Sequence, residues 1–247
     1  MTDPTDTARP NGAGPAPDPR DLLLDAMLMH VPFDGWGPAS VKAAIADTGI
    51  DPALARALFP RGGLDMAIAF HDRTDARLAV ELRAADLSAM RMRERIAHAV
   101  KLRLELAGDK ECVRRAAALF ALPTHAVDGA RLIWRTADTI WTALGDASDD
   151  INWYSKRSIL SGVYGATVLY WLGDDTPDCA PTWEFLDRRI GDVMQFEKVK
   201  AKANGNSVFR TVFAGPLWAL GRVRAPVRVN DDLPGRVNPG NGSAAAG

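Results

Sequence analysis

The sequence is poor in the residues from which disulfide frameworks and metal sites are built. It has two cysteines, Cys112 and Cys179, and four histidines spread along 247 residues. Two cysteines so far apart form neither a disulfide framework nor a CxxC metal site, and they fit a reducing compartment. The sequence also lacks the glycine-rich phosphate loop, the dinucleotide loop and the nucleophile elbow of the common enzyme classes.

The histidines do not form a recognisable catalytic pattern. None follows a glutamate by three positions, so the Glu-x-x-His pair of a di-iron bundle is absent. Glu94 and His98 lie four positions apart, but a lone pair at this spacing is more typical of a surface contact than of a metal site. We therefore predict no metal, no cofactor and no enzymatic activity; a catalytic cluster assembled only in the folded chain is the alternative.

The sequence also has little charge imbalance and no long apolar run. Its 30 basic and 31 acidic residues give a net charge of −1, which argues against a general polyanion binder. No apolar run reaches the roughly 18–20 residues needed to span a bilayer. Residues 1–19 are rich in Pro, Gly, Ala and Asp and have no apolar core, so they predict a disordered tail rather than a targeting segment. Residues 225–247 predict a second disordered tail.

Between the tails the hydrophobic pattern is helical throughout and predicts an all-α bundle. The expected helices cover residues 21–31, 38–47, 51–59, 64–87, 91–106, 110–121, 124–144, 152–172 and 181–200. Asp51 and Pro52 provide a helix cap and a proline at the first helical position. We divide this part into a helix-turn-helix-like module (20–70), an all-α lipid- and partner-binding domain (71–200) and an amphipathic helix (201–224).

Residues 21–70 resemble the N-terminal module of TetR-family regulators. The resemblance rests on the aromatic-glycine turn around Trp36, a second helix ending at Gly49, and a short third helix. This segment has three basic residues against six acidic ones, and Arg56 is the only donor-bearing side chain of the predicted recognition helix. Because DNA affinity depends on cations that neutralise phosphates, we predict a degenerate module that binds no nucleic acid. A TetR-type ligand-responsive repressor is the alternative.

Aromatic and small residues gather in the last third of the predicted bundle. Large side chains fall at helical spacing on the faces of the helices 124–144 and 152–172, interrupted by Gly162, Gly165 and Ala166. This pattern is typical of a packed core, or of an apolar cavity where small residues leave space. On the second interpretation the predicted lipid contacts are Ile133, Ala137, Trp141, Leu160, Tyr164, Val168 and Trp171.

Trp153 and Tyr154 form a different kind of feature. They lie at a predicted helix start among charged residues, and adjacent side chains on a helix point about 100° apart. Both rings can therefore hardly enter one core, and exposed aromatics flanked by charge are typical anchors of protein interfaces. We predict a partner-binding role for this pair.

The segment after residue 200 has the pattern of a membrane-surface helix. Residues 198–230 contain seven basic side chains and no acidic one. Flanking cations beside an apolar face suit the interface of an anionic membrane, with a core-packing terminal helix as the alternative. The predicted membrane contacts are Phe209, Val212, Phe213, Leu217, Trp218 and Leu220.

Three sequence blocks together resemble one known family. They are W-x-x-x-G-D (141–146), D-x-N-W-Y-S-K-R (150–157) and T-W-x-F-L-x-x-R (182–189). They closely resemble the accessory-protein family of ubiquinone biosynthesis often called COQ-nine, over about residues 21–224. The resemblance implies a TetR-like fold that does not read DNA. It also implies a lipid-binding protein, not an enzyme, that delivers an isoprenoid intermediate to the di-iron demethoxyubiquinone hydroxylase.

The resemblance also implies sites and a location. The family's partner-facing patch corresponds to Asp150, Trp153 and Tyr154, with Ile140 as a further position, and its C-terminal amphipathic helix engages membrane. The chain shows no mitochondrial presequence, so we expect a bacterial form that is cytoplasmic and peripheral at the inner face of the cell membrane. Its partner is then a ubiquinone-pathway hydroxylase of open identity. By analogy with TetR-like bundles we expect a homodimer.

Overall fold

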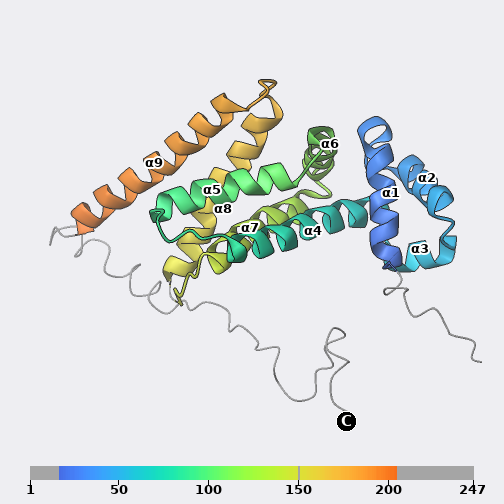
Figure 1. Cartoon of the computed structure of the whole chain (residues 1–247), viewed down its shortest axis with the longest axis horizontal. Helices are drawn as coiled ribbons and strands as arrows, with labels where there is room; N and C mark the ends of the chain where they lie inside the picture. The colour runs from blue at the N-terminus through green and yellow to red at the C-terminus, as the bar shows by residue number, and fades with distance from the viewer. Residues whose placement is uncertain (1–16, 150, 205–247) are drawn as a thin grey trace, which may run out of the picture.

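A computed structural model describes residues 17–149 and 151–204, which form nine α-helices and no strand (Figure 1). The helices are α1 (Pro19–Asp34), α2 (Pro38–Thr48), α3 (Pro52–Leu58), α4 (Gly63–Ala84), α5 (Met92–Leu106), α6 (Lys110–Phe120), α7 (Ala126–Ala143), α8 (Ile151–Leu172) and α9 (Ala180–Asn204). The predicted all-α class and the order of helices are confirmed. None of these helices combines the length and the apolarity required to cross a membrane.

Helix starts follow the local sequence closely. The Asp51 carboxylate accepts hydrogen bonds from the backbone N–H groups of Ala53 and Leu54 at 2.7 and 3.1 Å, so the predicted cap of α3 is confirmed. Asp18 caps α1 in the same way, and α1 therefore begins inside the segment predicted to be disordered. Of that segment, residues 1–16 lie outside the described part of the chain.

Helices α1, α2 and α3 form a compact N-terminal module at one end of the molecule (Figure 1). Its core is built from Leu23, Leu24, Met27, Val31, Trp36, Ala44, Ala55 and Phe59, and it continues onto α4 and α6. The indole N–H of Trp36 donates a hydrogen bond to the Cys112 carbonyl on α6 at 3.1 Å. At Gly63 a Cβ atom would come within 2.3 Å of the Trp36 carbonyl oxygen, so the start of α4 packs directly on the module's backbone.

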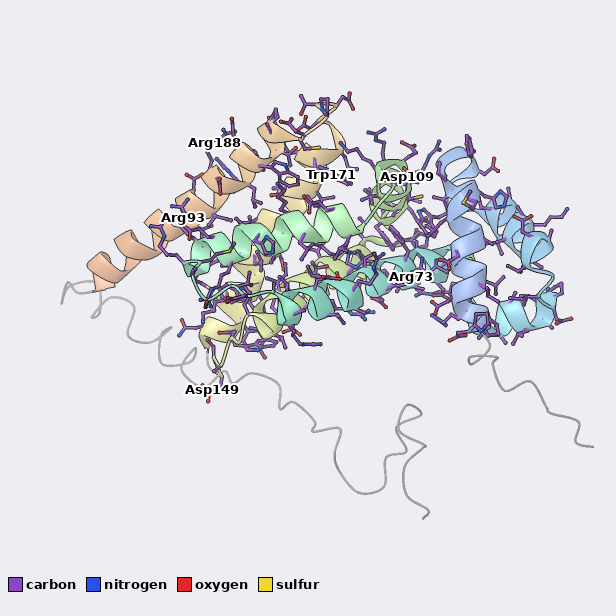
Figure 2. The ribbon with its side chains drawn as sticks, viewed as in Figure 1. Arg73, Arg93, Asp109, Asp149, Trp171 and Arg188 are labelled. Atoms are coloured by element: carbon purple, nitrogen blue, oxygen red, sulfur yellow. The ribbon has the colours of Figure 1, made fainter. Side chains whose placement is uncertain are left out.

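The rest of the described chain packs around a second core. This core joins α4, α5, α7, α8 and α9 through residues such as Leu78, Leu104, Ile140, Leu160 and Ile190, and Figure 2 shows side chains crowding the space between these helices. The predicted boundary at residue 70 falls inside α4, which runs without a break from the N-terminal module into this core. Helix α9 continues four residues beyond the predicted end at residue 200. The remainder of the predicted membrane helix, with Phe209, Val212, Phe213, Leu217, Trp218 and Leu220, lies outside the described residues, as does the tail 225–247.

Candidate functional site

A cavity of about 420 Å³ opens between α6, α7 and α8 and reaches inward to α4 and α5. Its wall is almost entirely apolar. Three of the seven predicted lipid contacts, Ile133, Tyr164 and Val168, line it. The cavity also lies where the sequence pattern placed small residues beside large ones, and Gly165 is part of its wall.

Small residues explain why the space exists. A Cβ atom at Gly129 would lie 2.8 Å from the Phe120 Cβ, so the missing side chain lets α6 and α7 approach closely at one edge. At Gly165 a Cβ atom would meet only the Cδ1 of Ile133, at 3.7 Å, so the cavity remains open there. The contribution of α6, through Ala116, Ala117 and Phe120, was not anticipated from the sequence. The available signal was the run of small residues at 116–118 on α6.

The inner end of this cavity carries a buried polar cluster. The guanidinium of Arg103 donates from Nε to the Asp75 carboxylate at 2.6 Å, and the Thr136 hydroxyl donates to the same carboxylate at 3.0 Å. His71 Nδ1 lies 3.5 Å from that carboxylate, too far for a good hydrogen bond, and has no hydrogen-bond partner. Burial lowers the pKa of His71 and outweighs the neighbouring Asp75 carboxylate, which raises it; the positive charge of Arg103 acts in the same direction as burial. Its imidazole is therefore neutral at physiological pH.

The outer end of the cavity is apolar. Leu169 lines the opening, and 69% of its surface is exposed. Leu122 and Val127, which follow the lining residues Ala121 and Ala126 in the sequence, are also exposed. Among the residues that line the cavity, Leu169 therefore carries the apolar wall out to the surface.

The other predicted lipid contacts lie elsewhere. Trp141 and Leu160 line a second cavity of about 330 Å³ between α5, α8 and α9, which also carries the polar side chains of Arg93 and Lys156. Ala137 and Trp171 are buried in the second core and line neither cavity, so the packed-core alternative holds for these two. Amphipathic spacing alone did not separate them from the wall residues, because both kinds face inward.

Trp153 and Tyr154 lie together with Trp134 in an aromatic cluster. The centroids of the Trp153 and Tyr154 rings are 4.8 Å apart in an edge-on arrangement, and Trp134 lies 6.0 Å from Trp153 and 6.4 Å from Tyr154. The expectation of two diverging, exposed rings was wrong, since both are half-buried. The side chains of Trp153 and Tyr154 leave the helix in different directions, but both rings turn toward Trp134 on α7, which is a neighbour of each.

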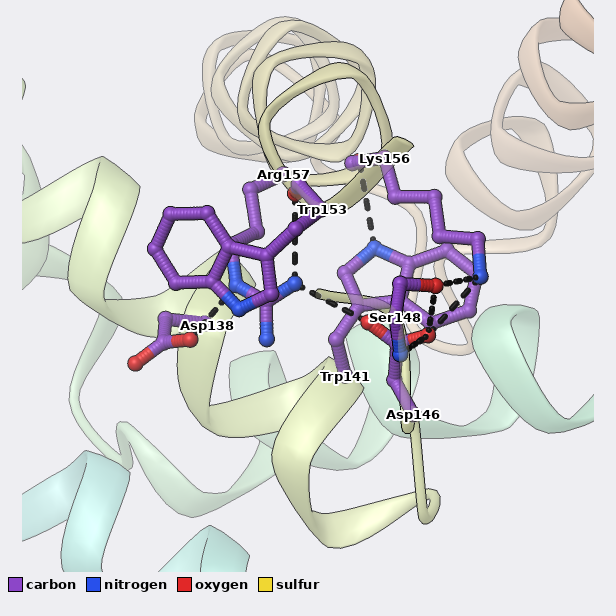
Figure 3. Close-up of polar contacts among 7 residues, drawn as sticks. All are labelled: Asp138, Trp141, Asp146, Ser148, Trp153, Lys156 and Arg157. Carbon is purple, nitrogen blue, oxygen red and sulfur yellow. Dashed lines mark hydrogen bonds and ion pairs between the residues drawn. The ribbon is translucent and has the colours of Figure 1, made fainter. Parts of the chain in front are cut away.

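A buried arginine, Arg157, lies against Trp153, one member of this cluster (Figure 3). The guanidinium of Arg157 lies 4.0 Å from the Trp153 ring centroid, and its side chain is 0% exposed. It donates to Asp138 at 2.6 Å and to Asp146 at 3.0 Å. Burial opposes the charge of Asp146, but hydrogen bonds donated by Lys156, Ser148 and Arg157 lower its pKa to about 2. The W-x-x-x-G-D and NWYSKR blocks are therefore joined by ion pairs in space.

Two further predicted partner contacts have different outcomes. Ile140 is completely buried in the second core, so its prediction as a partner-facing residue is wrong for this conformation. Its position on the inner face of α7 leaves no surface to offer. Asp150 lies outside the described residues. Within the described ranges no group of three or more His, Cys, Asp or Glu side chains is placed to hold a metal ion, and Glu94 pairs with Arg91 rather than with His98.

Comparisons with known proteins point to one family. A family model for COQ9 matches residues 126–197, which include α7, α8 and the aromatic cluster. The chain is 31% identical over 191 residues to the mitochondrial ubiquinone biosynthesis protein COQ9 of Drosophila melanogaster, covering 75% of this chain and 58% of that protein. It is 32% identical over 180 residues to the COQ9 protein of Rattus norvegicus, covering 70% and 57%. The aligned part thus spans less than two thirds of these relatives' length.

A solved structure supports the fold. The crystal structure of a TetR transcriptional regulator from Nitrosomonas europaea superposes with a TM-score of 0.58 at 21% sequence identity, covering 70% of this chain and 95% of that one. At this identity the likeness concerns architecture alone, and it confirms the predicted TetR-like fold. The relatives, the family model and the three sequence blocks agree in one similarity, to the COQ9 family.

Proposed function

We propose that this protein serves ubiquinone biosynthesis as a non-enzymatic lipid carrier, holding a polyprenylated quinone intermediate in the cavity between α6, α7 and α8. The pathway is inferred from the relatives in Drosophila melanogaster and Rattus norvegicus, which are both named ubiquinone biosynthesis proteins. The observation that carries the proposal is the cavity itself, about 420 Å³ with a nearly all-apolar wall. This volume lies within the range of about 300–1,000 Å³ typical of small-molecule sites.

The physical driving force is the removal of an isoprenoid chain from water. At roughly 25 cal/mol per Å² of apolar surface, burying even part of such a chain is worth several kcal/mol. A longer tail extends past Leu169, whose exposed side chain continues the apolar wall to the surface. The proposed location, peripheral at the inner face of a cell membrane, rests on the sequence of residues 198–230 alone. A homodimer likewise stays a prediction.

The cavity can be filled from inside to test the proposal. Gly165→Leu places an isobutyl group into open space beside Ile133, and we expect it to abolish copurification of quinone or isoprenoid lipid with the protein. The measurement is mass spectrometry of organic extracts from protein purified out of native membranes. Retention of lipid at the wild-type level in Gly165→Leu would contradict the cavity as the binding site.

Gly162→Leu is the matched control. It lies three residues earlier on the same helix, and a Cβ atom there meets nothing within 4 Å. Both substitutions gain about 1 kcal/mol in helix propensity, so they differ only in whether the new side chain enters the cavity. We expect Gly162→Leu to retain its lipid. Empty wild-type protein in repeated preparations would overturn the proposed function itself.

We further propose that the aromatic cluster of Trp134, Trp153 and Tyr154 docks a ubiquinone-pathway hydroxylase. Trp153→Ala is the appropriate variant, because Trp153→Lys would place a second cation against the Arg157 guanidinium. Aromatic anchors of interfaces carry 2 kcal/mol or more, so we expect about 30-fold weaker association, measured by pull-down or calorimetry with the hydroxylase. Trp183→Ala, a half-buried tryptophan on α9, is the control. Equal loss in both variants would assign Trp153 a structural role only.

A further inference from the structure

We propose that the inner end of the cavity between α6, α7 and α8 is a head-group subsite for an uncharged hydrogen-bonding ring, so that the ligand binds head inward with its tail leaving past Leu169. The inference rests on the proposed function and goes beyond it, because it states the chemistry of the head group and the direction of the ligand. It is carried by the placement of three polar side chains, His71, Arg103 and Tyr164, in a wall that is otherwise apolar.

The three polar side chains meet at one point. Arg103 Nε lies 2.6 Å from Asp75 Oδ1, and His71 Nδ1 lies 3.5 Å from Asp75 Oδ2. The Tyr164 hydroxyl lies against Thr136, whose own hydroxyl donates to Asp75 at 3.0 Å. Every other residue of the wall is a glycine or has an apolar side chain. A ligand with one polar end and one apolar end therefore fits in one direction.

Arg103 and His71 do not use all of their hydrogen-bonding groups within the cluster. Arg103 carries five N–H donors, and its hydrogen bonds within the described residues reach Asp75 from Nε and the His71 carbonyl from Nη2. His71 Nδ1 is buried, and its contact with Asp75 Oδ2 at 3.5 Å is too long for a good hydrogen bond. Buried polar atoms whose hydrogen bonds are incomplete cost stability, so a ligand that completes the bonds of His71 and Arg103 at the end of this cavity would be favoured.

The charge of the cluster selects the head group. Arg103 and Asp75 neutralise each other, and the neutral state of His71 adds no charge. A phosphate or carboxylate at this place would be buried without a free counter-charge, which is strongly unfavourable. A carbonyl, phenol or methoxy oxygen needs only the spare hydrogen bonds. The subsite is therefore suited to a quinone- or phenol-type ring and excludes an anionic lipid head.

Three ligands with the same decyl tail test this proposal on the full-length protein. They are a decyl-1,4-benzoquinone, decylbenzene without a polar head, and decyl phosphate with an anionic one. By calorimetry or competition against a fluorescent lipid probe, we expect wild-type protein to bind the quinone about tenfold more tightly than decylbenzene and to bind the phosphate most weakly. One to two neutral hydrogen bonds account for this ratio.

Variants that replace a polar ring by an apolar one, or delete a hydroxyl, assign the effect to the subsite. His71→Phe and Tyr164→Phe should each weaken quinone binding about three- to tenfold and leave decylbenzene binding unchanged. His125→Phe is the matched control, since His125 is another half-buried histidine but lies outside this cavity. It should change neither affinity. Thermal melting verifies that each variant folds, and the hydroxyl deletion at Tyr164 leaves the ring packing intact.

The possible failures are distinguishable. If His71→Phe and Tyr164→Phe leave quinone binding unchanged, or weaken quinone and decylbenzene equally, the head-inward orientation is wrong while lipid binding stands. Tightest binding of decyl phosphate would also overturn it. If none of the three ligands binds wild-type protein, the proposed function fails together with the subsite.

Discussion

Asp75→Ala should destabilise the protein by about 3–5 kcal/mol, the range observed when one partner of a buried ion pair is removed. Asp75 is the only acid that contacts Arg103 among the described residues, and the side chains of both are more than nine-tenths buried. The substitution leaves the guanidinium charged in an apolar surrounding and leaves the Thr136 hydroxyl with only its longer contact to the Leu132 carbonyl, at 3.3 Å. Native stability is typically about 5–15 kcal/mol, so such a loss removes a large part of it.

Urea denaturation followed by circular dichroism measures this loss. Asp72→Ala is the control, because Asp72 pairs with Arg135 at the surface and such pairs contribute about 0–1 kcal/mol. The double variant Asp75→Leu/Arg103→Met replaces both charges with apolar groups and should regain most of the stability. If the double variant is as unstable as Asp75→Ala, packing rather than an unpaired charge explains the effect.

Arg157→Met should cost a similar amount, about 3–5 kcal/mol, and should also loosen the aromatic cluster. The substitution leaves Asp146, only 3% exposed, without the Arg157 half of its ion pairs, and it removes the cation from the face of Trp153. The methionine side chain retains the apolar contacts of the arginine stem, so lost charge dominates. Denaturation gives the stability change, and quenching of tryptophan fluorescence reports the exposure of Trp134 and Trp153.

Lys156→Met separates the two neighbouring cations. Lys156 also pairs with Asp146, at 2.8 Å, but its side chain is 38% exposed. We expect a loss of less than about 1 kcal/mol and unchanged quenching, because water replaces a partly exposed ammonium at little cost. Equal losses for Arg157→Met and Lys156→Met would show that burial does not determine the strength of these ion pairs.

The sequence was most informative where local chemistry decides the structure. The Asp51 cap and the glycine after α2 determine backbone geometry within a few residues, and both were placed correctly. Gly165 was also identified as a source of space, because small residues between large ones on one helix are visible in the pattern.

The sequence was least informative where distant segments meet. The inner end of the cavity joins His71, Asp75, Arg103 and Tyr164 from three helices, and no spacing rule connects them. Trp153 and Tyr154 were expected to diverge, because their common neighbour Trp134 lies on another helix. Ile140 and Trp141 are adjacent and both apolar, yet one fills the core and the other borders a cavity. Helical periodicity identifies the inward face but not whether that face meets a neighbour or a void.

Helix α4 is one unbroken rod that serves two parts of the molecule. Its first residue, Gly63, sits hard against the main chain at Trp36, and two turns later the same rod presents His71 to the cavity. Because a continuous helix moves largely as one body, the packing of α1, α2 and α3 on the start of α4 is coupled to the depth of the cavity at His71. A ligand that displaces His71 would therefore also shift the N-terminal end of α4, on which the N-terminal module packs at Trp36.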